Sequence, residues 1–268
     1  MSSLRARCPD CRTFTAVAIG EGYECHSCGR SFAAGLVRVP RAWGTGGEGM
    51  AEGAGIPLPY PETAIVERET LEEQSAAIAD VLPSRPVVLG GCCCAHVGAV
   101  RGLARRVDRI AVIWIDAHGD LNTPETSPSG NLWGMPFRML LDAGYVRPED
   151  AAPVGARSLD PPEVEFMTAV GIDDSIDRAL AGVDAAYVAL DLDKLCVEHA
   201  LGISKSIAHH DAPRSSVPPP NFLEHDEFDV EDGNVTAGSL REGAPLEECP
   251  AERAPHVFLG VLRPSEGI

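Results

Sequence analysis

The sequence predicts an α/β fold with a central parallel sheet, preceded by a small cysteine-rich module. Two observations predict this. Between residues 62 and 195, apolar runs that suit buried strands alternate with segments of helical composition, an order typical of βαβ units in a parallel sheet. Ahead of them, within residues 1–40, stand two CxxC pairs, which are typical of a metal-binding segment.

The composition of the chain makes some classes of binding partner unfavourable. The 268 residues include 22 basic and 40 acidic side chains, for a formal net charge of −18. This charge argues against nucleic acid or an anionic membrane surface as a partner. No apolar run approaches the roughly 20 residues that a membrane-spanning helix needs, and the first residues lack the apolar segment of a secretory signal. We therefore expect a cytoplasmic protein.

The first 40 residues are expected to bind structural zinc. Cys8 and Cys11 form one CxxC pair and Cys25 and Cys28 a second, with thirteen residues and a hairpin-like sequence between them. Four thiolates can close a tetrahedron around Zn²⁺, and the metal then supplies folding energy that so short a segment cannot obtain from a core. The segment resembles a zinc ribbon. Two disulfides or a redox-active CxxC remain alternatives.

The next elements lead into the α/β region. Residues 41–61 are rich in glycine and proline and predict a linker or an extended loop. Residues 62–82 have helical composition and open with an acid, so a packing helix is expected. A buried strand follows at 85–91, where the glycines at 90–91 permit close backbone approach, and then a helix through HVGAVRGLARR.

The stretch from Arg109 to Pro136 is the richest in candidate functional residues. Its apolar run at 110–115 predicts a buried strand, after which Asp116, His118 and Asp120 follow at alternate positions. If the chain stays extended, these side chains share one side, at the strand end where α/β folds bind ligands. Two carboxylates and an imidazole aimed at one point require a cation to offset repulsion and desolvation. A metal site is therefore predicted, with a solvated acidic turn as the alternative.

Further elements continue the alternation. Helices are expected at 135–145 and within 163–183, a short strand at 152–157, and an apolar strand at 185–193 that ends in Asp191 and Asp193. Residues 196–268 are rich in proline, histidine and acid, and are expected to be irregular apart from a late strand at 256–262. The abrupt change near residue 196 is consistent with divergence or with a shift of the reading frame.

These motifs resemble those of the ureohydrolases, the family of arginase, agmatinase and formimidoylglutamase. The resemblance spans about residues 85–195 and is densest in WIDAHGDLNTPETSPSGNLWGMP, which is most similar to the bacterial arginase branch. The DxD that ends the strand at 185–193 and the segment VGARSLDPPE at 154–163 match two further family motifs. The resemblance implies a three-layer α/β sandwich with a central parallel sheet, in a homo-oligomer.

The resemblance also implies the cofactor and the metal ligands. The family binds two manganese ions, and oxygen and imidazole donors suit Mn²⁺ or another divalent metal. The residues that match family metal ligands are Asp116, His118, Asp120, Asp191 and Asp193.

The implied reaction is hydrolysis of a linear guanidino or amidino compound. Two cations roughly 3.5–4 Å apart lower the pKa of a bridging water, and the resulting hydroxide attacks the guanidino carbon. Asp120 would hold that hydroxide while it binds metal, with His118 beside it. The positions that match substrate-binding residues are Asn122, Ser129, Asn131 and Asp160, the last of which would help hold the substrate's amino group.

Three departures from the family pattern bear on activity. Cys93 stands where the family has a histidine ligand, with His96 three residues on. Either residue or neither could complete the metal site, and a thiolate would favour softer zinc or iron. Trp133 replaces the family's proton-shuttling histidine, and loss of a general acid or base typically costs ~10²–10⁴-fold in rate. Cys196 and Val197 replace the Asp-Pro that follows DxD, and the later glutamate that binds the guanidinium is not recognisable.

The leading hypothesis is a metal-dependent hydrolase of linear amidines. Its organisation would be a zinc ribbon at 1–40, a linker at 41–61, a ureohydrolase-like domain at 62–195 and a divergent acidic segment at 196–268. The alternative is a catalytically impaired protein of this family that binds or regulates, which the changes at Cys93 and Trp133 favour. A third hypothesis is a scaffold that docks partners through the ribbon.

Overall fold

The computed structural model describes residues 5–45, 47–191, 230–231, 234–235 and 258–264. The chain divides into two compact units, Met1–Asp211 with Arg253–Ile268, and Ala212–Glu252, and each is treated by itself. In the second unit the described residues form an antiparallel pair, β11 (Val230–Glu231) and β12 (Asn234–Val235). Asp193 and most of the segment 196–268 lie outside the described residues.

The cysteine-rich module is a four-stranded antiparallel sheet. Its strands follow the chain in order: β1 (Arg5–Ala6), β2 (Ala16–Ile19), β3 (Gly22–Cys25) and β4 (Ser31–Phe32). The hairpin expected between the CxxC pairs is confirmed, because β2 and β3 pair directly, with Ala16 opposite Cys25. Its small core contains Ala6, Ala16, Tyr23 and Phe32 together with buried cysteines, too few side chains to hold a fold without a further constraint.

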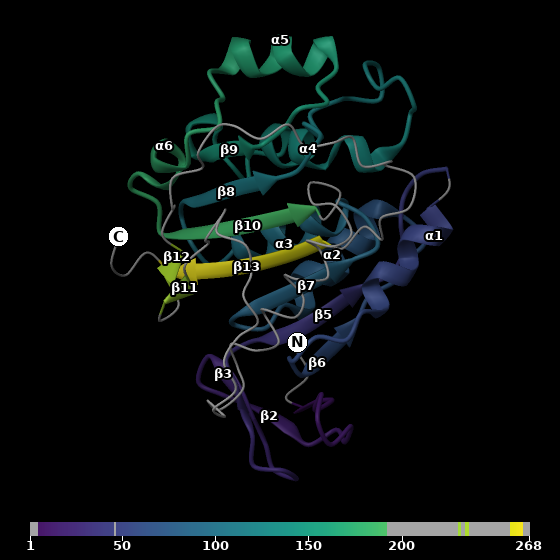
Figure 1. The fold of residues 1–268 in the computed structure, drawn as a ribbon, viewed down its shortest axis with the longest axis vertical. Coiled ribbons are helices and arrows are strands. Elements are labelled where there is room, and N and C mark those ends of the chain that lie inside the picture. Colours follow the sequence, from purple (N-terminus) through teal and green to yellow (C-terminus); the bar gives the residue numbers. More distant parts are fainter. Residues whose placement is uncertain (1–4, 46, 192–229, 232–233, 236–257, 265–268) are drawn as a thin grey trace, which may run out of the picture. The chain divides into compact units, whose positions relative to one another are not determined.

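The central sheet has seven strands in the order β6-β5-β7-β13-β10-β8-β9 (Figure 1). Every pair that excludes β13 is parallel, and β13 is antiparallel to both of its neighbours. The strands are β5 (Gly35–Val39), β6 (Glu62–Ile65), β7 (Pro86–Gly90), β8 (Ile110–Ile115), β9 (Ala151–Val154), β10 (Ala185–Asp191) and β13 (Phe258–Pro264).

The prediction of a parallel sheet is therefore confirmed for the strand pairs on either side of β13. It is wrong for β13, which runs antiparallel to both of its neighbours. An apolar run has the same pattern in either direction, so the late strand could be predicted but its orientation could not. The strand β5 was also not foreseen. It lies within the range first assigned to the ribbon, yet it pairs with β6 and β7, so the central sheet begins before residue 40.

Helices cover both faces of this sheet and make three layers. On one face, α2 (Leu71–Val81), α3 (Ala95–Leu103), α4 (Pro136–Asp142) and α5 (Pro161–Val170) share a core with the sheet. Along β8 the side chains alternate: Trp114 enters this core, and Ile113 faces the other side with Ala179 of α6 (Ile176–Leu180). Shorter helical segments are α1 (Gly47–Ala51), η1 (Glu52–Gly55), η2 (Leu132–Gly134) and η3 (Pro148–Asp150).

The single helix expected over residues 62–82 is only partly right. Residues 62–65 form the strand β6 instead, and α2 begins at Leu71. Thr70 sets this start because its hydroxyl accepts a hydrogen bond from the Glu73 amide and its own amide donates to the Glu73 carboxylate, both at 3.2 Å. This reciprocal capping satisfies two of the free amides of the first turn. The other expected helices and strands between residues 85 and 191 are present.

No helix within the described ranges combines the length and the apolar character that crossing a membrane would require.

Strand β7 ends in close contact with the segment that follows β5. The amide of Gly91 donates to the carbonyl oxygen of Val39 at 2.8 Å, and a Cβ at Gly91 would collide with the carbonyl oxygen of Pro40. The expectation that these glycines permit close backbone approach is thereby confirmed, and the contact fixes the chain immediately before Cys92.

Replacing Gly91 by alanine is predicted to destabilise the fold. The added methyl group must push against the backbone at Pro40, which we expect to cost about 1–3 kcal/mol. Gly55→Ala is the matched control, because a Cβ there meets nothing within 4 Å and its effect should stay within about 0.5 kcal/mol. Urea unfolding of both variants measures the difference. Equal transition midpoints would contradict the close contact.

Candidate metal centre

Three buried carboxylates lie at the ends of two adjacent strands. Asp116 directly follows β8 and Asp191 is the last residue of β10, and these strands pair in parallel with Leu190 beside Ile115. The relative exposures of Asp116, Asp120 and Asp191 are 2%, 3% and 5%. The apolar run of β8 buries this strand on both faces, so its end carries the first polar side chains into the interior.

Cys93 is brought to the same point from β7. Its thiol donates to the carboxylate of Asp191, with 3.5 Å between Sγ and Oδ2, and lies 3.9 Å from Oδ2 of Asp116. The side-chain ligand atoms of Cys93, Asp116 and Asp120 all fall within 4.8 Å of one another. One thiol and three carboxylates from three strand ends therefore share one small volume, which we call the carboxylate–thiol cluster.

The backbone at Asp120 is left-handed, with a φ of 51°. This conformation is uncommon for a residue other than glycine, although aspartate tolerates it better than most. The sequence-based expectation of an extended turn is thus wrong at this position. Asp120 still reaches the cluster, since its ligand atom lies within 4.8 Å of those of Cys93 and Asp116. Backbone strain of this kind tends to gather at functional sites.

Glu163 holds this strained loop in place. It is 3% exposed, and its two oxygens accept hydrogen bonds from the backbone amides of Leu121 and Asp160, both at 2.8 Å. One buried carboxylate thus joins the loop after β8 to the start of α5. Sequence reasoning did not single out Glu163. The signal was available, since Asp160 and Glu163 have the spacing of a helix capping box.

The charged forms of the side chains in this cluster are strongly unfavourable. Burial, and then the charge of Asp116, raise the pKa of Asp120 well above its ordinary value. Burial, followed by the nearby carboxylates, likewise raises the pKa of the Cys93 thiol. Among the described residues, Oδ2 of Asp120 is a buried oxygen with no hydrogen-bond partner. Buried acceptors without partners are costly, and a divalent cation would satisfy all of these groups at once.

His118 lies at the edge of the cluster. Its amide donates to Oδ1 of Asp116 at 2.8 Å and its Nδ1 lies 3.4 Å from the same oxygen, while its side chain is 52% exposed. The imidazole is therefore adjacent to the predicted metal ligands and open to solvent.

His96 lies in the core of the first helical face. Its Nδ1 is 2.7 Å from the hydroxyl of Tyr187, and its ring packs edge-on against Trp114 with centroids 5.2 Å apart. Burial lowers its pKa to about 3. Of the two residues that could complete the metal site, the structure brings Cys93 to the carboxylates and places His96 among aromatic side chains.

The four predicted substrate-binding residues form two groups. Asn122 donates through Nδ2 to Oδ2 of Asp160 at 2.8 Å, so these two are brought together beside the cluster. The amide of Asn131 donates to the hydroxyl of Ser129 at 3.2 Å, and its side-chain oxygen accepts from the amide of Thr45 at 2.9 Å. The loop that carries Ser129 and Asn131 is thus tied to the segment that follows β5.

Trp133 packs in the same region. A Cβ at Gly44 would overlap the Trp133 ring, and the amide of Leu132 donates to the carbonyl oxygen of Trp43 at 3.1 Å. Only a glycine leaves room for the indole at this point.

The four ribbon cysteines are also gathered into a cluster. Their sulfur atoms lie within 4.8 Å of one another, with 3.7 Å between those of Cys8 and Cys28 and 3.5 Å between those of Cys11 and Cys25. All four are free thiols. Burial raises the pKa of Cys25, but hydrogen bonds from the hydroxyl of Thr15 and from backbone amides outweigh it and lower the value to about 6.

Comparison with known proteins places the chain. The model of the Arginase family matches residues 50–207, which is more than half of the sequence. The chain belongs to the arginase family. The arginase of Bacillus subtilis (strain 168) is 35% identical over 151 residues, covering 46% of this chain and 51% of that protein. The arginase of Bacillus caldovelox is 34% identical over 167 residues, covering 50% and 56%.

The chain thus spans about half the length of the curated arginases that it matches. Among solved structures, the arginase from Bacillus subtilis is similar with a TM-score of 0.44 and 24% identity, covering 66% of this chain and 70% of that one. The formimidoylglutamase from the same species has a TM-score of 0.39 and 15% identity, covering 65% and 62%. The predicted membership of the family is confirmed by the family match alone.

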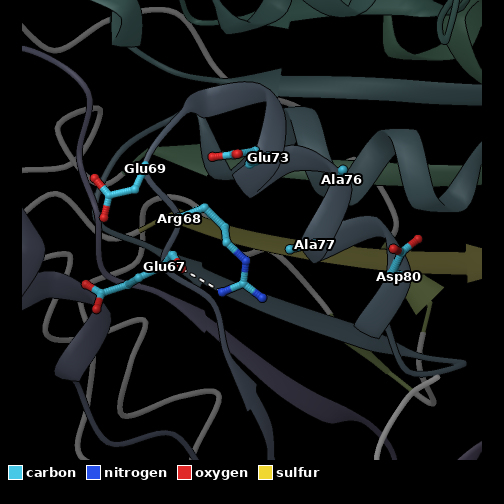
Figure 2. Close-up of a pocket in the computed structure, with 7 residues that line it drawn as sticks. All are labelled: Glu67, Arg68, Glu69, Glu73, Ala76, Ala77 and Asp80. Carbon is cyan, nitrogen blue, oxygen red and sulfur yellow. Dashed lines mark hydrogen bonds between the residues drawn. The ribbon is translucent and has the colours of Figure 1, made fainter.

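A hollow elsewhere on this arginase-family chain does not belong to the cluster. It has a volume of about 550 Å³ and is lined by residues from the start and one side of α2 (Figure 2): Glu67, Arg68, Glu69, Glu73, Ala76, Ala77 and Asp80. Arg68 lies among the acidic side chains and donates to the carbonyl oxygen of Glu67 at 2.7 Å. It shares no residue with the carboxylate–thiol cluster, and we place no chemistry in it.

Glu163→Gln is predicted to loosen the loop that carries Asp120. The glutamine can accept from only one of the two backbone amides and turns its own amide toward the other, which should cost about 1–3 kcal/mol. Glu165→Gln, on the exposed side of the same helix, is the control and should be nearly neutral. Chemical unfolding of both variants checks this. If the two lose equal stability, Glu163 does not hold the loop.

The buried His96 predicts a pH-dependent stability. Its pKa is about 3 in the folded chain against an ordinary value of 6.5, so between these values the unfolded chain binds a proton that the folded chain excludes. Stability present above pH 6.5 is therefore lost as the pH falls. Relative to His96→Gln, the free energy of unfolding of the wild type should fall by about 1.4 kcal/mol per pH unit from roughly pH 6 to pH 4.

Urea unfolding of both proteins at three pH values in this range provides the measurement. Parallel pH profiles would contradict the burial of a neutral His96.

Proposed function

We propose that this protein hydrolyses a linear guanidino or amidino compound with the help of divalent metal ions bound at the carboxylate–thiol cluster. The single observation that carries the proposal is the convergence of Cys93, Asp116, Asp120 and Asp191 at one buried point, in a chain of the arginase family. An arginine-like compound is the first candidate substrate, because the sequence is similar to arginases, with identities of 34–35%.

The donor set fits divalent cations. Asp116, Asp120 and Asp191 offer oxygen ligands, and the unpartnered Oδ2 of Asp120 is buried where a cation would bind it. His118 could add an imidazole by a turn of its exposed ring, and Asp193, outside the described residues, completes the ligand set that the family resemblance implies. Two divalent ions, which the family resemblance implies to be Mn²⁺ before Cys93 is considered, would lower the pKa of a water and so supply the nucleophile at neutral pH.

The remaining residues would bind and orient the substrate. Asp120 would accept a hydrogen bond from the nucleophilic water; the closeness of its carboxylate to Cys93 and Asp116, within 4.8 Å, supports this role. Asp160, held by Asn122, offers a carboxylate for an amino group, and the loop with Ser129 and Asn131 offers hydroxyl and amide groups for a carboxylate. An α-amino acid bearing a guanidino group has both of these polar groups at one end.

Proton transfer to the leaving group is the weakest step. Trp133 occupies the family position of the proton shuttle, and an indole cannot exchange a proton at neutral pH. His118 lies beside Asp116 and is open to solvent, but an imidazole bound to the metal could not also carry protons, so we assign proton transfer to solvent water. Turnover is expected to be slow.

A binding or regulatory role is the second candidate. The observation that favours it is the contact between the substrate loop and the segment at 43–45, where the Asn131 side chain already accepts a hydrogen bond from Thr45 and Trp133 fills the space at Gly44. A protein of this kind would bind a guanidino compound without turning it over.

The cysteine cluster of the ribbon is proposed to hold one structural Zn²⁺. Four free thiols within 4.8 Å of one another support this, because four thiolates complete a tetrahedral zinc site with no open position for chemistry. We also propose a cytoplasmic homo-oligomer, in keeping with the family resemblance.

Release of urea or ammonia from a panel of guanidino compounds, after separate loading with Mn²⁺, Co²⁺ and Zn²⁺, tests the hydrolase. Trp133→His should raise kcat by about 10²-fold by restoring a proton shuttle, with a new dependence on a pKa near 6.5, and Trp133→Phe should not. If neither the wild type nor Trp133→His turns over any compound while a guanidino ligand still binds, the binding role replaces the hydrolase.

A further inference from the structure

We infer that the carboxylate–thiol cluster selects a thiophilic divalent cation, of the class of Zn²⁺ and Co²⁺, over Mn²⁺, with Cys93 Sγ as the selecting ligand. This rests on the proposed metal centre and assigns the kind of ion that it takes. Manganese sites in proteins are built from carboxylate, carbonyl and water oxygens, sometimes with imidazole, whereas thiolates favour zinc and other softer ions. A site in which a thiolate shares one ion with carboxylates belongs to the second class.

The position of Cys93 carries the first step. Its sulfur lies 3.5 Å from an oxygen of Asp191 and 3.9 Å from an oxygen of Asp116, and the side chain is 5% exposed. A thiol is a weak hydrogen-bond donor, so two contacts with buried carboxylates repay little of their desolvation. A cation that binds the thiolate and both carboxylates replaces these weak contacts with ligand bonds.

The unpartnered oxygen of Asp120 is the independent observation. Asp120 is 3% exposed, its Oδ2 has no hydrogen-bond partner among the described residues, and its carboxylate lies within 4.8 Å of both the Cys93 sulfur and Asp116. A buried acceptor without a donor, in a group with a thiol and a second carboxylate, fits a cation bound among these three residues.

The neighbouring Cys92 shows that the position of Cys93, and not simply the presence of a cysteine, carries this role. Cys92 is equally buried, but its thiol is directed to the carbonyl oxygen of Arg41, with a distance of 4.0 Å. Cys92 is not among the described residues that form a candidate metal group, whereas Cys93 is. The chain therefore offers a matched control one residue away.

Cobalt binding tests the inference without reference to turnover. The full chain, reduced and freed of metal, first receives one equivalent of Zn²⁺ to fill the ribbon and is then titrated with Co²⁺. The wild type and Cys92→Ser should develop a sulfur-to-cobalt charge-transfer band in the near ultraviolet, and Cys93→Ser should lose it. Any exchange of cobalt into the ribbon would appear equally in all three proteins and is subtracted.

Metal competition provides the second measurement. In equimolar Mn²⁺ and Zn²⁺, the wild type should bind Zn²⁺ as its metal beyond the ribbon. Cys93→His exchanges the soft thiolate for an imidazole that Mn²⁺ accepts, so it should shift the ratio toward Mn²⁺ by roughly tenfold or more. The inference is overturned if the wild type shows no charge-transfer band, if Cys93→Ser keeps the full band, or if the wild type prefers Mn²⁺.

The outcome is separable from that of the proposed function. A Cys93-dependent band without hydrolysis of any guanidino compound would uphold the metal assignment and remove the hydrolase. Hydrolysis with Mn²⁺ and no such band would do the reverse.

Discussion

The confinement of a thiol and three carboxylates at one buried point is the constraint on which the rest of the structure depends. Each of these groups would be hydrated in isolation, and burial together makes their charged forms costly. These groups are nevertheless brought together, because the carboxyl ends of β7, β8 and β10 lie on the same side of the sheet. The strands themselves are apolar, so their first polar residues follow at these ends. The left-handed Asp120 and the buried Glu163 follow from the same constraint, since both serve to keep one carboxylate turned inward.

Much of the fold follows from the sequence because most of its strands have a distinctive pattern. Runs such as 110–115 and 185–191 are buried on both faces or nearly so, and only a central strand satisfies that pattern. The edge strand β6 was missed because the sequence ETAI has no such run, and its identity depends on pairing with β5. The orientation of β13 depends on how the chain reaches it, which no local pattern records.

The candidate site could be predicted in its residue types but not in its geometry. Asp116, Asp120 and Asp191 converge as the strand rule requires, but Asp120 does so through a backbone conformation that spacing alone cannot reveal. The choice between Cys93 and His96 also needed the structure, because it depends on which way the first turn before α3 presents its side chains. The His96 ring contacts Tyr187 and Trp114. Tyr187 lies 91 residues further along the sequence, so no local pattern predicts this contact.

The contact between the cysteine-rich module and strand β6 bears on aggregation of the central sheet. Strand β6 forms an outer edge of the seven-stranded sheet, and Ile65 within it is 58% exposed. Backbone hydrogen bonds run both ways between Arg7 and Glu62, each at 2.9 Å, so the residue that follows β1 of the cysteine-rich module lies at the start of that edge. An open edge is a template for pairing with another chain. Where these two hydrogen bonds form, the N-terminal module occupies the backbone groups of β6 that could otherwise pair with another chain.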